Sequence, residues 1–191
     1  CVDVLSSKGY LNAMLAMDLC QMVTQGLWNN DNGLKQIPFF NDNIIEKCKE
    51  QKVHSVYDIM ELDENVREDI LKGLSTTQVS EVADFVNKYP NLEITYRLEG
   101  DVFAGENKDI EIEISRDESV EDLSIVSSTY PTKKFEGWWI VIGNTANNEL
   151  YSIKKLTITK ENQKVRMDFT IPEAGKHNVY IWCVCDSYLE A

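Results

Sequence analysis

The run from Gly137 to Gly143 (GWWIVIG) is the most apolar stretch of this chain of 191 residues. In an extended strand successive side chains point to opposite faces, so Trp138 lies on one face and Trp139 on the other. Each face also carries isoleucine or valine, and both faces are therefore apolar. Such a strand is typical of a protein interior, where it is covered on both sides. We expect a second β-sheet on one face, and the helical part of the chain or another protein on the other.

Residues 92–191 alternate apolar and polar side chains, as in the segment from Leu92 to Leu98. This period of two predicts β-strands, and turn-forming residues such as Pro131 separate them. Seven short strands in this arrangement indicate an antiparallel β-sandwich of immunoglobulin or fibronectin type. The predicted strands are residues 92–98, 110–115, 123–126, 137–143, 150–159, 165–171 and 179–184.

Residues 1–33 predict a helix with a break near Gly9, followed by turn residues after Trp28. Its apolar residues recur at spacings of three and four, with Leu15 and Leu19 on a stripe that further Met, Val and Leu residues widen. A stripe this wide predicts a helix buried on most sides within a bundle. Because methionine adapts to irregular surfaces, a binding groove is the alternative.

Residues 34–91 predict short helices joined by tight turns, with Asn41 and Ser55 as N-terminal caps. This order is similar to the helix-hairpin-helix arrangement, whose glycine-rich turn presents backbone N–H groups to a phosphate. Here the corresponding turn runs from Pro38 to Phe40. Proline has no N–H group and the two phenylalanines would crowd a phosphate. We therefore expect a structural or protein-binding role for this segment rather than nucleic-acid contact.

The sequence thus predicts an α+β chain of three consecutive parts. These are the end of a helical bundle (residues 1–33), a helix-hairpin-helix domain (34–91) and the β-sandwich (92–191). An apolar share of 43% is ordinary for a globular protein. The net charge of −13 disfavours broad binding to nucleic-acid backbones, because like charges repel.

Motifs for catalysis are missing: the sequence has no phosphate-binding loop, no dinucleotide fingerprint and no nucleophile elbow. The five cysteines are odd in number and irregularly spaced, which favours free thiols in a reducing compartment. Cys183 and Cys185 share a strand face, but a metal site would need further ligands and the chain has only two histidines. We predict no catalytic, cofactor or metal site in these residues.

Two sets of candidate binding residues remain. Trp138 and Trp139 are candidates for partner binding, to the extent that either ring is exposed. A local excess of lysine is the candidate for RNA contact; the alternative is solvated edge and turn lysines that oppose aggregation. These lysines are Lys133, Lys134, Lys154 and Lys155.

As a set, several segments make the chain similar to the Sec-sixty-three homology unit. This unit follows each helicase cassette of the two-cassette DExH-box RNA helicases of the spliceosome, and consists of a helical bundle, a helix-hairpin-helix domain and a fibronectin-like sandwich. The resemblance covers essentially the whole chain and is strongest to the C-terminal cassette. The segments are 17–28, 34–38, 56–60, 87–91, 137–139, 152–157, 177–178 and 186–188.

The resemblance implies a parent protein that binds ATP and magnesium in another cassette and unwinds small nuclear RNAs during spliceosome activation. This part would be a non-catalytic nuclear module that docks spliceosomal proteins of the tri-snRNP and braces the adjacent cassette, without membrane contact. It also implies that earlier bundle helices and a final strand after Glu190 lie outside this sequence, which would leave an unpaired sheet edge. The alternatives are an RNA-contacting accessory domain and the same unit in the endoplasmic reticulum translocation protein.

Overall fold

The computed structural model describes residues 1–191 and divides into two compact units. The first unit, which we call the sandwich unit, comprises residues 1–20, 92–123 and 136–186. The second, the helical unit, comprises residues 21–91, 124–135 and 187–191. Both units are discontinuous in sequence because the chain crosses between them repeatedly. No helix is long and apolar enough to cross a membrane.

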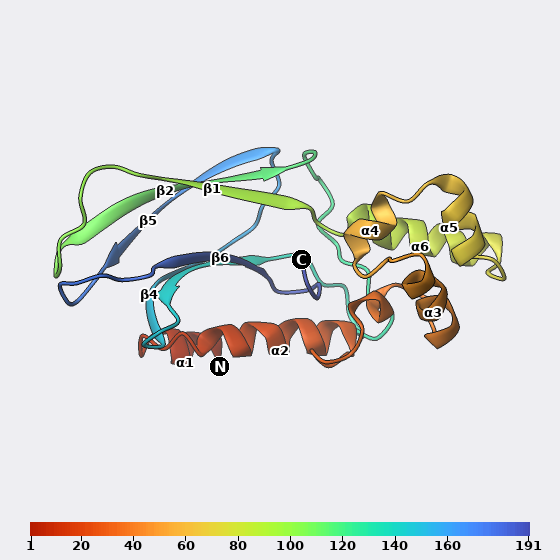
Figure 1. Ribbon diagram of the computed structural model, residues 1–191, viewed down its shortest axis with the longest axis horizontal. Coiled ribbons are helices and arrows are strands. Elements are labelled where there is room, and N and C mark those ends of the chain that lie inside the picture. Colours follow the sequence, from red (N-terminus) through yellow and green to blue (C-terminus); the bar gives the residue numbers. More distant parts are fainter. The chain divides into compact units, whose positions relative to one another are not determined.

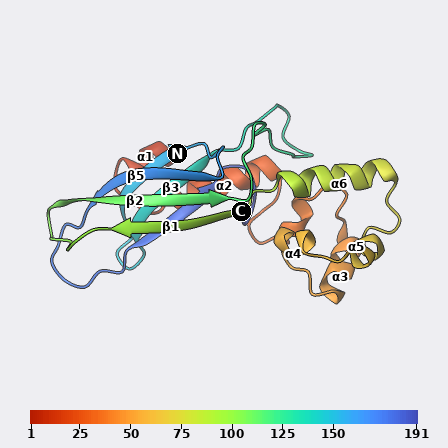
Figure 2. The ribbon, with the colours of Figure 1, turned by 90° about the horizontal axis from the view of Figure 1, so that it is seen from above.

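Two three-stranded antiparallel sheets form the sandwich unit (Figure 1). In the first sheet β2 lies between β1 and β5, as Figure 2 shows from above. In the second sheet β3 lies between β4 and β6. The strands are β1 (Leu92–Leu98), β2 (Asn107–Arg116), β3 (Trp138–Asn144), β4 (Glu149–Leu156), β5 (Asn162–Thr170) and β6 (Tyr180–Cys185).

Strand β3 is the apolar run identified from the sequence, and all seven of its residues are buried. Its Ile142 faces the other sheet, where it shares an apolar cleft with Ile112. Its other face, with Trp139 and Val141, packs against the N-terminal helices in one hydrophobic cluster with Met17. The expectation of two covered faces is confirmed, and the second cover is the helical part of the chain itself.

The glycines at the two ends of this run are required by close approach. A Cβ atom on Gly137 would lie 2.7 Å from a carboxylate oxygen of Asp186. A Cβ atom on Gly143 would lie 2.6 Å from the backbone oxygen of Glu149, at the point where the pairing of β3 with β4 shifts register. A larger residue would displace the carboxylate of Asp186 at position 137 and the backbone of the neighbouring strand at position 143.

A buried ion pair joins the two sheets. Glu136, directly before β3, accepts hydrogen bonds from Arg116 at 2.7 and 3.2 Å and from the indole N–H of Trp138 at 2.7 Å. Arg116 ends β2 and also donates to the backbone oxygen of Ile158, 2.9 Å away. Both charged side chains are almost fully buried, with 7% and 3% of their side-chain surface exposed. The polar atoms of this buried group therefore find partners within the fold.

The helices of the sandwich unit lie on one face of the β4-β3-β6 sheet (Figure 1). They are α1 (Val2–Ser6) and the first part of α2 (Ala13–Gln25), up to Cys20. The predicted break is present between them, and Gly9 has a positive φ of 72° there. From Gln21 onward α2 belongs to the helical unit.

Two helices of the helical unit begin with the side-chain caps that the sequence predicts, Asn41 and Ser55. Asn41 accepts from the amides of residues 43 and 44 at the start of α3, and Ser55 forms a capping box with Asp58 in α4. Ser75 forms a second capping box with Gln78 in α6. The elements are η1 (Gly33–Gln36), α3 (Asp42–Glu50), α4 (Val56–Met60), α5 (Glu64–Ile70) and α6 (Thr76–Lys88).

The last residues of the chain are part of the helical unit. The amide side chain of Gln36 both donates to and accepts from the backbone of Leu189, at 3.0 Å in each case. The hydroxyl of Tyr89 donates to the same Leu189 oxygen at 2.7 Å. Tyr188 is fully buried and packs edge-on against Phe85, with ring centroids 5.5 Å apart. This tail is therefore fixed by both backbone and side-chain contacts.

The structure confirms an α+β chain with antiparallel sheets, and corrects one strand. Residues 123–126 were expected to form a strand but make only an isolated bridge, between Ser124 and Phe135. Their backbone instead turns toward the helical unit, where the amide of Val126 donates to the hydroxyl of Tyr188. The helix-hairpin-helix and immunoglobulin or fibronectin assignments stay predictions, as do the three consecutive domains.

Replacing either tryptophan of β3 by alanine should destabilise the protein by about 3–5 kcal/mol, because each leaves a large cavity in the core. The exposed fractions are 1% for Trp138 and 6% for Trp139. Urea unfolding of each variant measures the loss. Trp28→Ala is the matched control, since this ring is exposed and its removal should change stability by less than about 0.5 kcal/mol. A small loss for Trp138→Ala would contradict its place in the core.

Removing one partner of the buried ion pair should cost about 3–5 kcal/mol, because it leaves a buried charge without compensation. The substitution Arg116→Met leaves the buried carboxylate of Glu136 without its charged partner. The double variant Arg116→Met/Glu136→Gln removes both charges and keeps an acceptor for the indole of Trp138, so it should be more stable than Arg116→Met alone. Urea unfolding of the wild type, of Arg116→Met, of Glu136→Gln and of the double variant gives the coupling energy between the two groups. Strictly additive losses would show that the two groups act independently.

Candidate protein-docking surface

Helix α2 is apolar on two opposite faces. Ala13 and Met17 are one turn apart and lie on the same face, and so do Leu15 and Leu19. Two residues of an α-helix correspond to about 200° of rotation, so the two leucines point away from Ala13 and Met17. The sequence predicts a helix buried on most sides, whereas the structure buries Ala13 and Met17 and leaves Leu15 and Leu19 exposed.

The inner face of α2 packs on the sheet. Ala13 and Met17 are fully buried against Trp139 and Val141 of β3. Leu11, just before the helix, joins the same cluster, and its amide donates to the backbone oxygen of residue 148 at 3.1 Å. These contacts fix the position of the helix on the sandwich unit.

The outer face of α2 is exposed. Leu15 is 66% exposed and Leu19 is 46% exposed, although both are large aliphatic residues. Exposed leucines scattered singly are common, whereas these two lie one turn apart on one face of the helix and form a candidate interaction patch. Asp18 lies between them in sequence, and partial burial raises the pKa of its carboxyl group above the ordinary value.

The structure places Trp138 and Trp139 in the core rather than on a surface. Trp139 is covered by α2 on its ring and by Lys155, whose ammonium nitrogen lies 4.8 Å from the ring centroid. A buried ring cannot contact a partner without a change in packing. Partner binding through either tryptophan thus stays a prediction, and the exposed apolar residues of the sandwich unit lie elsewhere.

The four candidate lysines fall in two different units. Lys133 and Lys134 belong to the helical unit, where Lys133 lies 5.0 Å from the ring centroid of Phe135 and Lys134 donates to the hydroxyl of Ser187. Each therefore has a partner within the helical unit. RNA contact through these two lysines stays a prediction.

The other two lysines are neighbours on β4, in the sandwich unit. Lys154 donates to the backbone oxygen of Arg166 at 3.2 Å, and Lys155 lies 3.4 Å from a carboxylate oxygen of Asp186. Their different partners fit the expectation that neighbouring strand residues point to opposite faces. Both side chains are already engaged by partners in the same unit, and RNA contact through them also stays a prediction.

The cysteines are all free, and the chain contains no group of three or more side chains that could hold a metal ion. Burial, together with the nearby charge of Glu136, raises the pKa of Cys183 to about 12. Burial also raises the pKa of Cys48. Cys48 is buried and Cys183 is partly buried, and both thiols therefore stay protonated near neutral pH.

Sequence comparisons give the chain a clear set of relatives. The family description "Sec63 Brl domain" matches residues 1–191. The chain is 42% identical to the U5 small nuclear ribonucleoprotein 200 kDa helicase of Drosophila melanogaster over 99% of its own length, and 40% identical to the human protein of the same name over 99%. It is 37% identical to the pre-mRNA-splicing factor brr2 of Schizosaccharomyces pombe, again over 99%. In each case the chain spans 9% of the length of the relative.

Stability at alkaline pH should depend on Cys183. The thiol has an ordinary pKa of 9.0 and a folded-state pKa of about 12, so above pH 9 the unfolded chain loses a proton that the folded chain keeps. The contribution of this thiol is therefore present below pH 9 and is lost between pH 9 and 12. Urea unfolding across this range should show a steeper fall for the wild type than for Cys183→Ala. Parallel curves would mean that the thiol is not buried. Cys1→Ala, at an exposed position, serves as the control.

Proposed function

Because the chain belongs to the Sec63 Brl domain family, we propose that it is a non-catalytic interaction and bracing module of a spliceosomal RNA helicase. The relatives that carry this segment are named as helicases and as a pre-mRNA-splicing factor, which supports a nuclear role in splicing. In this proposal ATP and magnesium bind to other parts of the parent polypeptide. The segment contributes contacts to the adjacent helicase cassette and to spliceosomal proteins.

The observation that carries the proposal is the exposed outer face of α2. Its inner face is fixed on the sheet by Met17, so the helix is held rigidly while Leu15 and Leu19 remain open to solvent. A rigid helix that presents aliphatic side chains at i and i+4 is suited to pack against another helix. Burying these two leucines against the cassette would convert a solvent-exposed apolar surface into an interface.

RNA contact is the competing function, and the lysines provide its test. Binding to a phosphate backbone would fall steeply with salt and would depend on free cations. Lys154 and Lys155 both have partners in the sandwich unit, and the chain as a whole is strongly acidic. These features favour contact with protein over contact with RNA.

We expect Leu15→Glu/Leu19→Glu to abolish association with the rest of the parent helicase while leaving the fold intact. The two positions are exposed, so the charges should change the free energy of unfolding by less than about 1 kcal/mol. The first measurement is co-elution of the chain with a parent helicase polypeptide from which these 191 residues have been removed. The second is the ATPase rate of that helicase polypeptide with the chain added. Lys154→Glu/Lys155→Glu is the matched control, with the same number of substitutions on the same unit.

Unchanged co-elution of the leucine variant would reject α2 as the bracing surface. The lysine variant could instead lose association, and RNase treatment could remove the association of the wild type as well. In that case the RNA-contacting function would take the place of the proposed one. Circular dichroism of both variants before mixing guards against loss of folding.

A further inference from the structure

The outer face of α2 carries one carboxylate beside its leucines. On the surface of an α-helix, residues three and four positions apart are neighbours, so Leu15 lies next to both Asp18 and Leu19. Leu15 and Leu19 are exposed, whereas Asp18 is half-buried. All three residues belong to the sandwich unit. A partner that covers the two leucines therefore also covers the carboxylate of Asp18.

Asp18 differs from the comparable acidic residues of the sandwich unit because its carboxylate has no partner. The carboxylate makes neither a hydrogen bond nor an ion pair within the chain. Every other buried or half-buried acidic residue of this unit has a hydrogen-bond or ion-pair partner within the unit. These residues are Glu111, Glu113, Glu136, Glu149 and Asp186. The missing partner of Asp18 is therefore an exception to the pattern of this unit.

Covering this carboxylate would cost free energy. A charge that leaves water is tolerated only when an opposite charge or hydrogen-bond donors replace the water. Partial burial already raises the pKa of Asp18, and no neighbouring cation lowers it. The chain by itself therefore holds a carboxylate that is partly removed from water and lacks a counter-ion. A basic residue of a partner at this point would supply the counter-ion.

We propose that the segment of the helicase cassette that packs on Leu15 and Leu19 places a lysine or arginine against Asp18. This inference rests on the proposed bracing function and specifies the chemistry of its partner. The segment would be a helix with aliphatic side chains one turn apart and a basic residue beside them. Such a helix matches the outer face of α2 in both shape and charge. The ion pair would fix the register of the two helices, because the leucines alone permit several registers.

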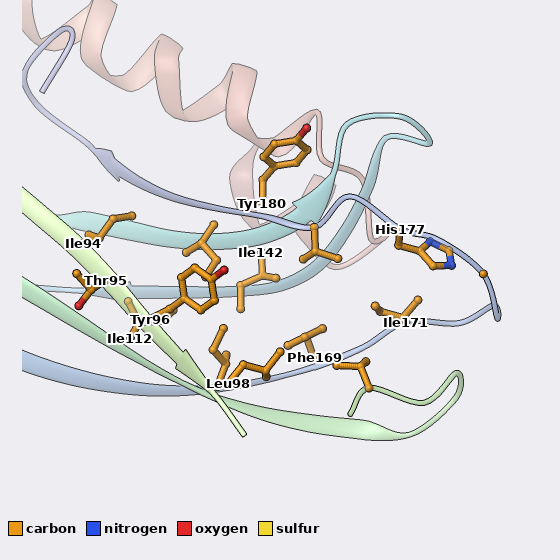
Figure 3. A pocket seen from close by; sticks show the side chains of 15 residues that line it. Ile94, Thr95, Tyr96, Leu98, Ile112, Ile142, Phe169, Ile171, His177 and Tyr180 are labelled. Carbon is orange, nitrogen blue, oxygen red and sulfur yellow. The ribbon is translucent and has the colours of Figure 1, made fainter. Parts of the chain in front are cut away.

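Two other occupants fit this face less well. A second copy of the chain packed through α2 would add a second Asp18 and no counter-ion, because α2 contains no lysine or arginine. Each copy also carries a net charge of −13, which opposes self-association. A purely apolar partner would leave Asp18 unpaired. It would suit a surface without charge, such as the cleft around Ile112 and Ile142 in Figure 3, which no aspartate, glutamate, lysine or arginine lines.

The substitution Asp18→Asn removes the charge and keeps the shape of the side chain. The probe is the parent helicase polypeptide from which these 191 residues have been removed, titrated against the labelled chain and followed by fluorescence anisotropy. Asp18→Asn should bind it at least about tenfold more weakly than the wild type. Added salt should weaken the wild type more than Asp18→Asn, because salt screens the ion pair. Asp109→Asn is the matched control, since it removes one charge at an exposed position on β2 of the same unit, and it should bind within about twofold of the wild type.

Unfolding and binding together decide the outcome. In urea, Asp18→Asn should be at least as stable as the wild type, because it removes a partly buried charge that has no partner. A loss of stability would reveal a partner inside the chain and overturn the inference. Binding as tight as that of the wild type, or an equal loss for Asp109→Asn, would overturn it as well.

The leucine variant separates this inference from the proposed function. If Leu15→Glu/Leu19→Glu releases the helicase polypeptide and Asp18→Asn does not, the bracing function stands and only the ion pair is rejected. If the leucine variant still associates, the bracing function fails and the ion pair is rejected with it.

Discussion

The buried carboxylate of Glu136 is the contact on which the sandwich unit depends. It receives the guanidinium of Arg116 from one sheet and the indole of Trp138 from the other, so a single group fixes how the two sheets align. Removing these charges from water is costly, and the pair is not a large net source of stability. Its value lies in geometry, because an apolar interface permits many alignments while this hydrogen-bonded group permits one. Burial and, to a smaller extent, this carboxylate raise the pKa of Cys183 to about 12.

Strand β3 shows how much of the fold the sequence could predict. Its two apolar faces require two covers, and the structure supplies one sheet and one helix for them. The caps Asn41 and Ser55 could also be predicted, since each interaction is local and involves residues two or three positions away. The remaining strands follow from the period of two. Residues 123–126 share this period but make only the isolated bridge of Ser124 with Phe135, and the amide of Val126 donates to the side-chain hydroxyl of Tyr188 instead of a neighbouring strand.

Helix α2 shows what hydrophobic pattern alone could not predict. Toward its end the buried side chains are polar: Gln21, Thr24 and Gln25. Gln25 donates to the backbone oxygen of Ser187 at 2.8 Å, a contact across 162 positions of the sequence. A buried amide side chain needs a hydrogen-bond partner of this kind. The local sequence pattern does not predict a partner that lies so far away along the chain. The exposure of Leu15 could not be predicted either. Apolar spacing does not distinguish a helix face that is covered by the same chain from one that is not.

The same reasoning explains why the candidate surfaces lie away from the most apolar residues. Trp138 and Trp139 are prominent in the sequence, but large apolar side chains are mostly buried in the core of the chain itself. Neither ring is therefore left on the surface for a partner. What remains for partners is apolar surface that the fold holds rigid but cannot cover. In the sandwich unit this describes the outer face of α2, a helix whose inner face packs on β3. In the proposed function, a surface held in this way would bind without ordering itself first, and this would lower the entropic cost of association.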